Sequence, residues 1–245
     1  MTTLVLLSGW GIDARIWRSL APYWPVDVVV RTPDWPGYGE RAHDILPTTL
    51  PALAGKMRDD LPCDAVWVGW SLGGLLAGAL LSHLPPPRGL VLVGTGPRFC
   101  SEDGVRPDEL AIFRRAFDRD PHTTWQHFLR WQLQGEPAAR IAHRRLLDLQ
   151  GRNPSASSQT LATGLDQLAR LDLSDVLATL PCPIHRLAGE RDKLMGSAAR
   201  QAADRLLTDS GHCPMLSRPD ALANHLVELA REIDLDHIGQ DQSVS

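Results

Sequence analysis

Short apolar runs and longer amphipathic segments alternate over the first hundred residues. Four runs are mostly apolar and end at Gly, Pro or polar residues: 4–7, 26–30, 65–68 and 90–93. Such runs are typical of strands that are buried on both faces of a parallel sheet. Apolar positions recur at helical spacing in segments 50–61 and 72–84. Strands that alternate with helices predict βαβ units and a mainly parallel sheet flanked by helices.

The alternation stops after residue 97. No strand-like run follows until residue 183, and four helices are expected instead, separated by Gly or Pro: 107–117, 122–133, 137–149 and 157–171. A strand pattern returns at 183–189, and a helical pattern follows at 220–233. We therefore expect three parts: an α/β core from residues 1–97 and 172–234, an inserted helical cap from residues 98–171, and a flexible polar tail over residues 235–245.

The composition is that of an ordinary globular protein, with 245 residues, 43% of them hydrophobic, and a formal net charge of −4. A chain with this charge has no general positive field to attract nucleic acid. No apolar run approaches the roughly 20 residues that span a bilayer. The N-terminus also lacks the basic start of a signal peptide. We expect a cytoplasmic protein with no membrane or nucleic-acid partner, and a monomer by default.

The cysteines do not form a metal-binding pattern. None of the four is paired at the short spacings of zinc sites: Cys63, Cys100, Cys182 and Cys213. In a reducing compartment we expect free thiols that pack as small hydrophobic side chains. The sequence contains no dinucleotide-binding fingerprint either. We therefore expect no metal and no organic cofactor.

One motif carries the chemistry. Segment 69–73, Gly-Trp-Ser-Leu-Gly, matches G-x-S-x-G and lies between a predicted strand and a predicted helix. In that setting a sharp turn projects Ser71 above the carboxyl edge of the sheet. The flanking Gly69 and Gly73 fit because larger side chains would collide there. A surface serine in an ordinary turn is the simpler alternative, and the flanking strand and helix argue against it. We expect Ser71 to be a nucleophile.

A serine hydroxyl is a weak nucleophile until a base takes its proton. In the α/β-hydrolase fold the partners follow the serine in the order Asp or Glu, then His. His212 lies in a Gly- and Pro-bounded loop before the last predicted helix. Asp192 follows the strand at 183–189, and Glu190 is its rival for the acid role. We prefer Asp192 because its place further along the loop gives the carboxylate more reach.

A tetrahedral intermediate also needs donors for its oxyanion. One donor is expected to be the backbone N–H of Leu72, directly after the nucleophile. The second is expected from the turn at 8–11, Ser-Gly-Trp-Gly, and we assign it to the N–H of Trp10.

At these residues the chain resembles the pimeloyl-[acyl-carrier protein] methyl ester esterases of biotin synthesis, within the α/β-hydrolase superfamily. The resemblance extends almost to the final helix and is carried by segments 6–11, 34–39, 68–74, 164–173, 189–194 and 211–214. It implies an α/β-hydrolase fold with a helical cap. One position departs from the family, because Ser8 stands where its members usually carry His before the first glycine. We expect the hydrogen bonds that support the oxyanion loop to differ there.

The resemblance implies hydrolysis of a methyl ester at the far end of a pimeloyl chain whose other end is carried on acyl carrier protein. A long acyl chain needs an apolar cleft. The expected walls are Trp10, Ile12, Trp70, Phe128 and Leu194. An acidic carrier with a phosphate also needs a basic surface, and arginine forks suit such groups. The candidates lie together in the cap, against the single acid Asp148: Arg140, Arg144, Arg145 and Arg152.

Three alternatives stay open at this point. A general carboxylesterase for short-chain esters would share the chemistry and would not need the arginine surface. A carbon–carbon bond hydrolase or a lyase could use the same three residues. A ligand receptor could use the fold without catalysis, although a complete Ser-Asp-His set argues against it.

Overall fold

A computed structural model describes residues 1–243, with the side chains of residues 1–235. Its centre is a six-stranded sheet in the order β2-β1-β3-β4-β5-β6. Every neighbouring pair is parallel. The strands are β1 Thr2–Leu7, β2 Val28–Arg31, β3 Val66–Trp70, β4 Gly89–Val93, β5 Ile184–Gly189 and β6 Arg205–Leu207. The predicted parallel α/β sheet is therefore confirmed.

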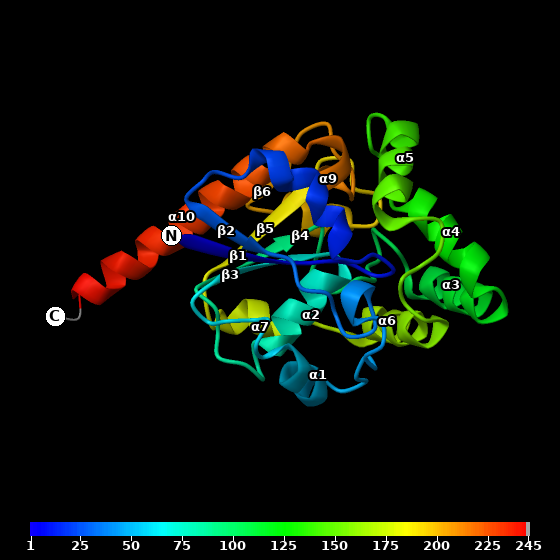
Figure 1. The fold of residues 1–245 in the computed structure, drawn as a ribbon, viewed down its shortest axis with the longest axis horizontal. Helices are drawn as coiled ribbons and strands as arrows, with labels where there is room; N and C mark the ends of the chain where they lie inside the picture. The colour runs from blue at the N-terminus through cyan, green and yellow to red at the C-terminus, as the bar shows by residue number, and fades with distance from the viewer. Residues whose placement is uncertain (244–245) are drawn as a thin grey trace.

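Helices cover both faces of this sheet (Figure 1). On one face lie η1, Ala14–Tyr23, and α10, Pro219–Ser243. The other face carries α1 Leu50–Met57, α2 Leu72–Leu80 and α7 Ser174–Thr179. Strands β3 and β4 are buried along their whole length because helices lie above and below them. This explains why their sequences are continuous apolar runs rather than alternating ones.

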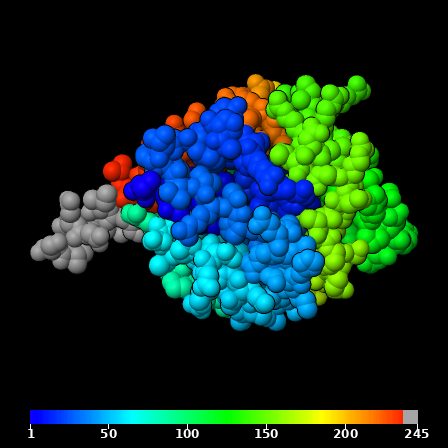
Figure 2. All heavy atoms as spheres, in the orientation of Figure 1, coloured from blue at the N-terminus to red at the C-terminus, as the bar shows by residue number. Residues whose placement is uncertain are grey.

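Four helices, called the cap from here on, stand at one end of the sheet: α3 Pro107–Arg119, α4 Pro121–Trp131, α5 Ala139–Gln150 and α6 Ser158–Arg170. Side chains set where two of them begin. Asp120 accepts a hydrogen bond from the N–H of Thr123, and Ser157 accepts one from the N–H of Thr160. An Arg114–Asp166 ion pair joins α3 to α6. Figure 2 shows the cap packed against the N-terminal segment.

Short elements escaped the sequence prediction. They are η1, η2 (Gly39–Arg41), α7, α8 (Ser197–Gln201), α9 (Pro214–Ser217) and β6. Most are too short to show a hydrophobic period, and Leu207 is the only buried residue of β6. The last predicted helix is longer than expected, because α10 continues to Ser243 and includes most of the segment expected as a polar tail. No proline follows Pro219 in this segment, so the helical hydrogen bonds can continue beyond Ile233.

Two further features of the described chain concern its class. All four cysteines are free, but only Cys182 and Cys213 are buried, whereas Cys63 is exposed, so the expected packing role fits only part of the set. Among the described helices, none combines the length and the apolar character that a membrane span needs.

Candidate active site

Ser71 stands in the sharp turn between β3 and α2. Its backbone has φ 56° and ψ −125°, a conformation that residues with a side chain rarely adopt. The turn is close-packed, because a Cβ at Gly69 would lie 2.4 Å from the Cα of Gly74. A Cβ at Gly73 would lie 2.5 Å from the carbonyl oxygens of Leu7 and Ser8. Both glycines of the motif are therefore required by contact with neighbouring backbone.

Two side chains from other strand ends meet beside this turn. His212 follows β6 and Asp192 follows β5, and both are buried. The Nδ1 of His212 lies 2.7 Å from Oδ2 of Asp192. The other carboxylate oxygen of Asp192 accepts hydrogen bonds from the N–H groups of Leu194, at 2.8 Å, and Met195, at 3.2 Å. These donors fix the carboxylate, and the carboxylate orients the imidazole.

Glu190, the rival for the acid role, points elsewhere. It is exposed, and its Oε2 accepts a hydrogen bond from the N–H of Asp209 at 3.3 Å. The contact with His212 belongs to Asp192.

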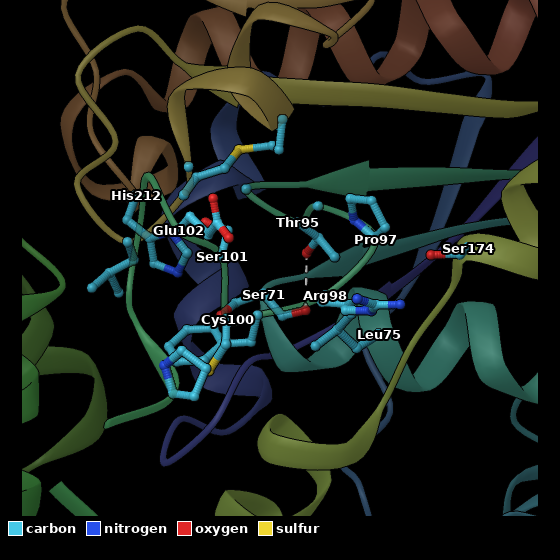
Figure 3. A pocket seen from close by; sticks show the side chains of 18 residues that line it. Ser71, Leu75, Thr95, Pro97, Arg98, Cys100, Ser101, Glu102, Ser174 and His212 are labelled. Atoms are coloured by element: carbon cyan, nitrogen blue, oxygen red, sulfur yellow. Dashed lines mark hydrogen bonds between the residues drawn. The ribbon is translucent and has the colours of Figure 1, made fainter. Parts of the chain in front are cut away.

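Ser71 and His212 line the same cavity, of about 430 Å³ (Figure 3). The Nε2 of His212 is buried and has no hydrogen-bond partner among the described residues. No described side chain therefore occupies this nitrogen. The walls are mostly apolar and include Leu75, Pro97, Phe99, Leu194, Met195 and Ala199. Polar groups of the lining include Arg98, Glu102 and Ser174, and Arg98 pairs with Asp172 at 2.6 Å.

Three indole groups hold the turn at 8–11, which follows β1. Trp35 donates to the carbonyl of Ser8 at 3.0 Å, and Trp125 of α4 donates to the carbonyl of Gly11 at 2.8 Å. Trp10 itself donates to the carbonyl of Leu161 in α6 at 2.8 Å. The turn also touches the serine, because a Cβ at Gly9 would lie 3.0 Å from the Cβ of Ser71. The backbone of this turn is thus fixed beside Ser71, partly by the cap.

The departure at residue 8 has a local consequence. The hydroxyl of Ser8 is buried and finds no hydrogen-bond partner among the described residues. Support of the turn comes from the indoles instead.

Most of the expected wall residues do not line the cavity, and Leu194 is the exception. Trp10 and Phe128 pack edge to face, with ring centroids 4.9 Å apart, in the contact between core and cap. Trp70 is buried and donates to the carbonyl of His212, and Ile12 is fully buried. Large apolar side chains near a site more often complete the core than face a ligand, and the sequence alone does not separate the two.

The four candidate arginines lie on α5 and just after it. All four are exposed, and none forms an ion pair with a described side chain. Arg145 donates to the carbonyl of Leu216 at 2.9 Å. Burial, with Arg130 and Arg152 nearby, lowers the pKa of His143. His143 therefore adds positive charge to this face only at low pH. None of the four lines the cavity.

Two residues at the end of β4 were missed. Thr95 donates through Oγ1 to the carbonyl of Ser71 at 2.9 Å (Figure 3). Gly94 has φ 59°, and a Cβ there would lie 3.2 Å from Nδ1 of His212. The glycine that follows the fourth apolar run was the available signal, since it marks the strand end next to β3.

Other chemistries find less support. No group of three or more His, Cys, Asp or Glu residues with metal-binding geometry occurs in the part of the chain that the structure describes. Burial raises the pKa of the Cys213 thiol well above its usual range. Cys213 is therefore protonated at neutral pH and is not a second nucleophile.

The parallel sheet, the strained serine turn and the buried His–Asp pair define a hydrolase architecture. The chain belongs to the alpha/beta hydrolase family, whose family model matches residues 4–225. Among curated proteins it is similar to the pimeloyl-[acyl-carrier protein] methyl ester esterase of Vibrio vulnificus (strain CMCP6), with 33% identity over 93% of each chain. The same enzyme of Klebsiella pneumoniae (strain 342) is 33% identical over 94% of each chain.

Solved structures agree on the fold. An esterase from Exiguobacterium antarcticum superposes with a TM-score of 0.76, at 19% identity, over 94% of this chain and 92% of that chain. The family model and the curated relatives confirm the family resemblance expected from the sequence.

Proposed function

We propose that this chain is a serine carboxylesterase that hydrolyses the methyl ester of pimeloyl-[acyl-carrier protein]. The observation that carries the reaction type is the meeting of Ser71 with the Asp192–His212 pair at one apolar cavity. The substrate rests on the names of the relatives, which match this chain over almost its full length.

The residues divide the chemistry as follows. Ser71 Oγ attacks the ester carbonyl carbon while Nε2 of His212 takes its proton. Asp192 keeps the imidazole in the required tautomer and stabilises the imidazolium. The N–H groups of Leu72 and Trp10 donate to the oxyanion, a contribution of about 3 to 4 kcal/mol per donor. His212 then gives this proton to the methoxide oxygen, which leaves as methanol as the tetrahedral intermediate collapses to the acyl-enzyme. A water molecule, activated by the same imidazole, releases the free carboxylate from Ser71.

The cavity and the cap suit a carrier-linked acyl chain. An apolar cavity lined by Ser71 accepts the methylene chain with its ester end at the nucleophile. The arginines on α5 and just after it, which form no ion pair with a described side chain, offer charge to an acidic carrier and its phosphate. We place the carrier on the face formed by Arg140, Arg144, Arg145 and Arg152. We also propose that the protein is a cytoplasmic enzyme and that its reaction needs no cofactor.

The deciding experiment compares substrates. Purified protein is incubated with pimeloyl-carrier methyl ester and with free short-chain methyl esters, and kcat/KM is measured for each. We expect the carrier-linked ester to be preferred by at least about tenfold, which is about 1.4 kcal/mol of differential transition-state binding. Equal values would favour a general carboxylesterase. Methanol release by wild type and its absence in Ser71→Ala is the control.

A further inference from the structure

A turn of the cap, residues 132–136, lies directly against the loops that carry Asp192 and His212. Gly135 has φ 95°, and a Cβ there would lie 2.1 Å from the carbonyl oxygen of Arg191. A Cβ at Gly211 would lie 3.0 Å from the backbone nitrogen of Glu136. The cap turn and both loops are therefore in backbone contact. A side chain that crosses this contact can therefore hold the loop that carries His212.

Glu136 reaches across it. Its side chain is buried, with 6% of the residue exposed, and Oε1 accepts a hydrogen bond from the N–H of Cys213 at 2.7 Å. The other oxygen, Oε2, is also buried and has no hydrogen-bond partner among the described residues. A carboxylate is costly to bury when it is so sparsely paired. The reversal of the chain at Gly135 does not need an acid, so folding of the turn does not account for Glu136.

The hydrogen bond falls on one particular peptide group. The N–H of Cys213 and the carbonyl of His212 belong to the same peptide. That carbonyl accepts a hydrogen bond from Trp70 Nε1 at 2.8 Å. Trp70, the core residue before Ser71, thus holds the carbonyl of this peptide, and Glu136 of the cap turn holds its N–H. Asp192 holds the ring at Nδ1. Contacts from the core, the cap and the loop of Asp192 thus fix His212, which lines the cavity with Ser71.

We propose that Glu136 is a positioning residue for the base, acting through the His212–Cys213 peptide and tying the histidine to the cap. The inference rests on the proposed serine-esterase function, in which His212 takes the proton of Ser71. Loss of the acceptor frees this peptide to rotate. A misplaced base lowers the rate of the chemical step more than it lowers substrate binding.

The test uses a small p-nitrophenyl ester, which needs no carrier docking. Glu136→Met keeps the volume of the side chain and removes the acceptor, and Glu136→Asp keeps the charge and shortens the reach. We expect each to lower kcat about tenfold or more with KM within about twofold of wild type. The rate of labelling by a fluorophosphonate should fall in parallel. Glu136→Gln keeps an oxygen acceptor of the same length and should recover most of the activity.

Gln134→Ala is the matched control, because it removes an exposed side chain from the same turn. Thermal unfolding identifies variants that do not fold, and if the Met variant fails, the Asp variant decides. The proposal is overturned if the folded variants keep kcat within twofold of wild type, or if Gln is as damaging as Met. A wild-type protein that neither cleaves the ester nor reacts with the fluorophosphonate would instead reject the esterase function itself.

Discussion

At the scale of single residues, contact with backbone determines what the site tolerates. Ser71 holds a strained conformation in a turn where neighbouring backbone leaves no room for side chains at Gly69 and Gly73. The motif and the order of acid and base were enough to select Ser71, Asp192 and His212 from the sequence. Gly94 and Thr95 were not selected, because their importance depends on which strand neighbours β3, and the sequence does not state that order.

Replacement of the serine tests the proposed nucleophile. Ser71→Ala should reduce esterase activity to about the background rate, a loss of several orders of magnitude, because the residues of the set act as a unit. His212→Ala should be about as damaging, and Asp192→Asn should also be severe. Circular dichroism and thermal unfolding check that each variant is folded. A folded Ser71→Ala protein with activity within tenfold of wild type would exclude Ser71 as nucleophile.

At the scale of elements, periodic segments were predictable and short ones were not. The four cap helices were expected within a few residues of their ends, because each has an apolar face and a Gly or Pro boundary. The walls of the cavity, Leu194 apart, were not expected. They come largely from the loop after β4 and from the loop that precedes α8, neither of which has a hydrophobic period. Trp10, Ile12, Trp70 and Phe128 were expected there because they are apolar and near the motifs. Trp10 and Phe128 pack cap on core instead, and Ile12 and Trp70 are buried in the core.

Helix α5 carries the prediction about the carrier. Replacing Arg140 and Arg144 together by Ala should lower kcat/KM for the carrier-linked ester by about tenfold or more, since exposed contacts give up to about 1 kcal/mol each. The loss should shrink as salt is raised, because screening already weakens the wild-type contact. Turnover of a small neutral ester should hardly change. Equal loss on both substrates would make these arginines structural, and no loss on either would leave them a solvated face.

The loop at 98–105 forms one wall of the cavity and is anchored to α8. Asp103 accepts hydrogen bonds from the hydroxyl of Ser197 and the N–H of Ala198, both at 2.7 Å, and these hold the pKa of its carboxyl at about 2. A lowered pKa stabilises the fold above the unfolded value of about 4, and this stabilisation is lost as pH falls toward 2. Denaturant unfolding of wild type and Asp103→Asn from pH 6 to pH 2.5 measures it. The wild-type advantage should be constant above pH 4 and shrink below it. An advantage that does not change with pH would contradict this.

At the scale of the whole molecule, cap and core share the site. The cap supplies Trp125 and the carbonyl of Leu161 to the turn at 8–11, and Glu136 to the loop of His212. The sequence indicated a cap from the change of pattern after residue 97. It could not indicate these contacts, because each joins residues that are far apart along the chain.

Removal of one indole donor tests whether the cap supports the turn at 8–11. Trp125→Phe should leave the buried carbonyl of Gly11 without its donor, at a cost of about 1 to 3 kcal/mol, or about 2 to 4 °C in Tm for each kcal/mol. It should also lower kcat, since the turn holds the expected oxyanion donor of Trp10. Trp67→Phe is the control, because Trp67 donates to the carbonyl of Pro62, before β3 and away from the site. The control should lose stability and keep kcat. Equal kcat in both variants would show that the cap does not act on the turn.

The indole contacts have a consequence for protein engineering and for descent. Caps are attractive parts to exchange between hydrolases when a new substrate range is wanted. A foreign cap would lack the indole N–H of Trp125, which donates to the carbonyl of Gly11. A chimera that joins a new cap to this core should therefore fold around a loosened turn and react slowly with every ester, whatever its new pocket binds. Successful exchange would require that the turn at 8–11 be replaced together with the cap. The two segments are distant in sequence, and we expect them to be inherited as one unit.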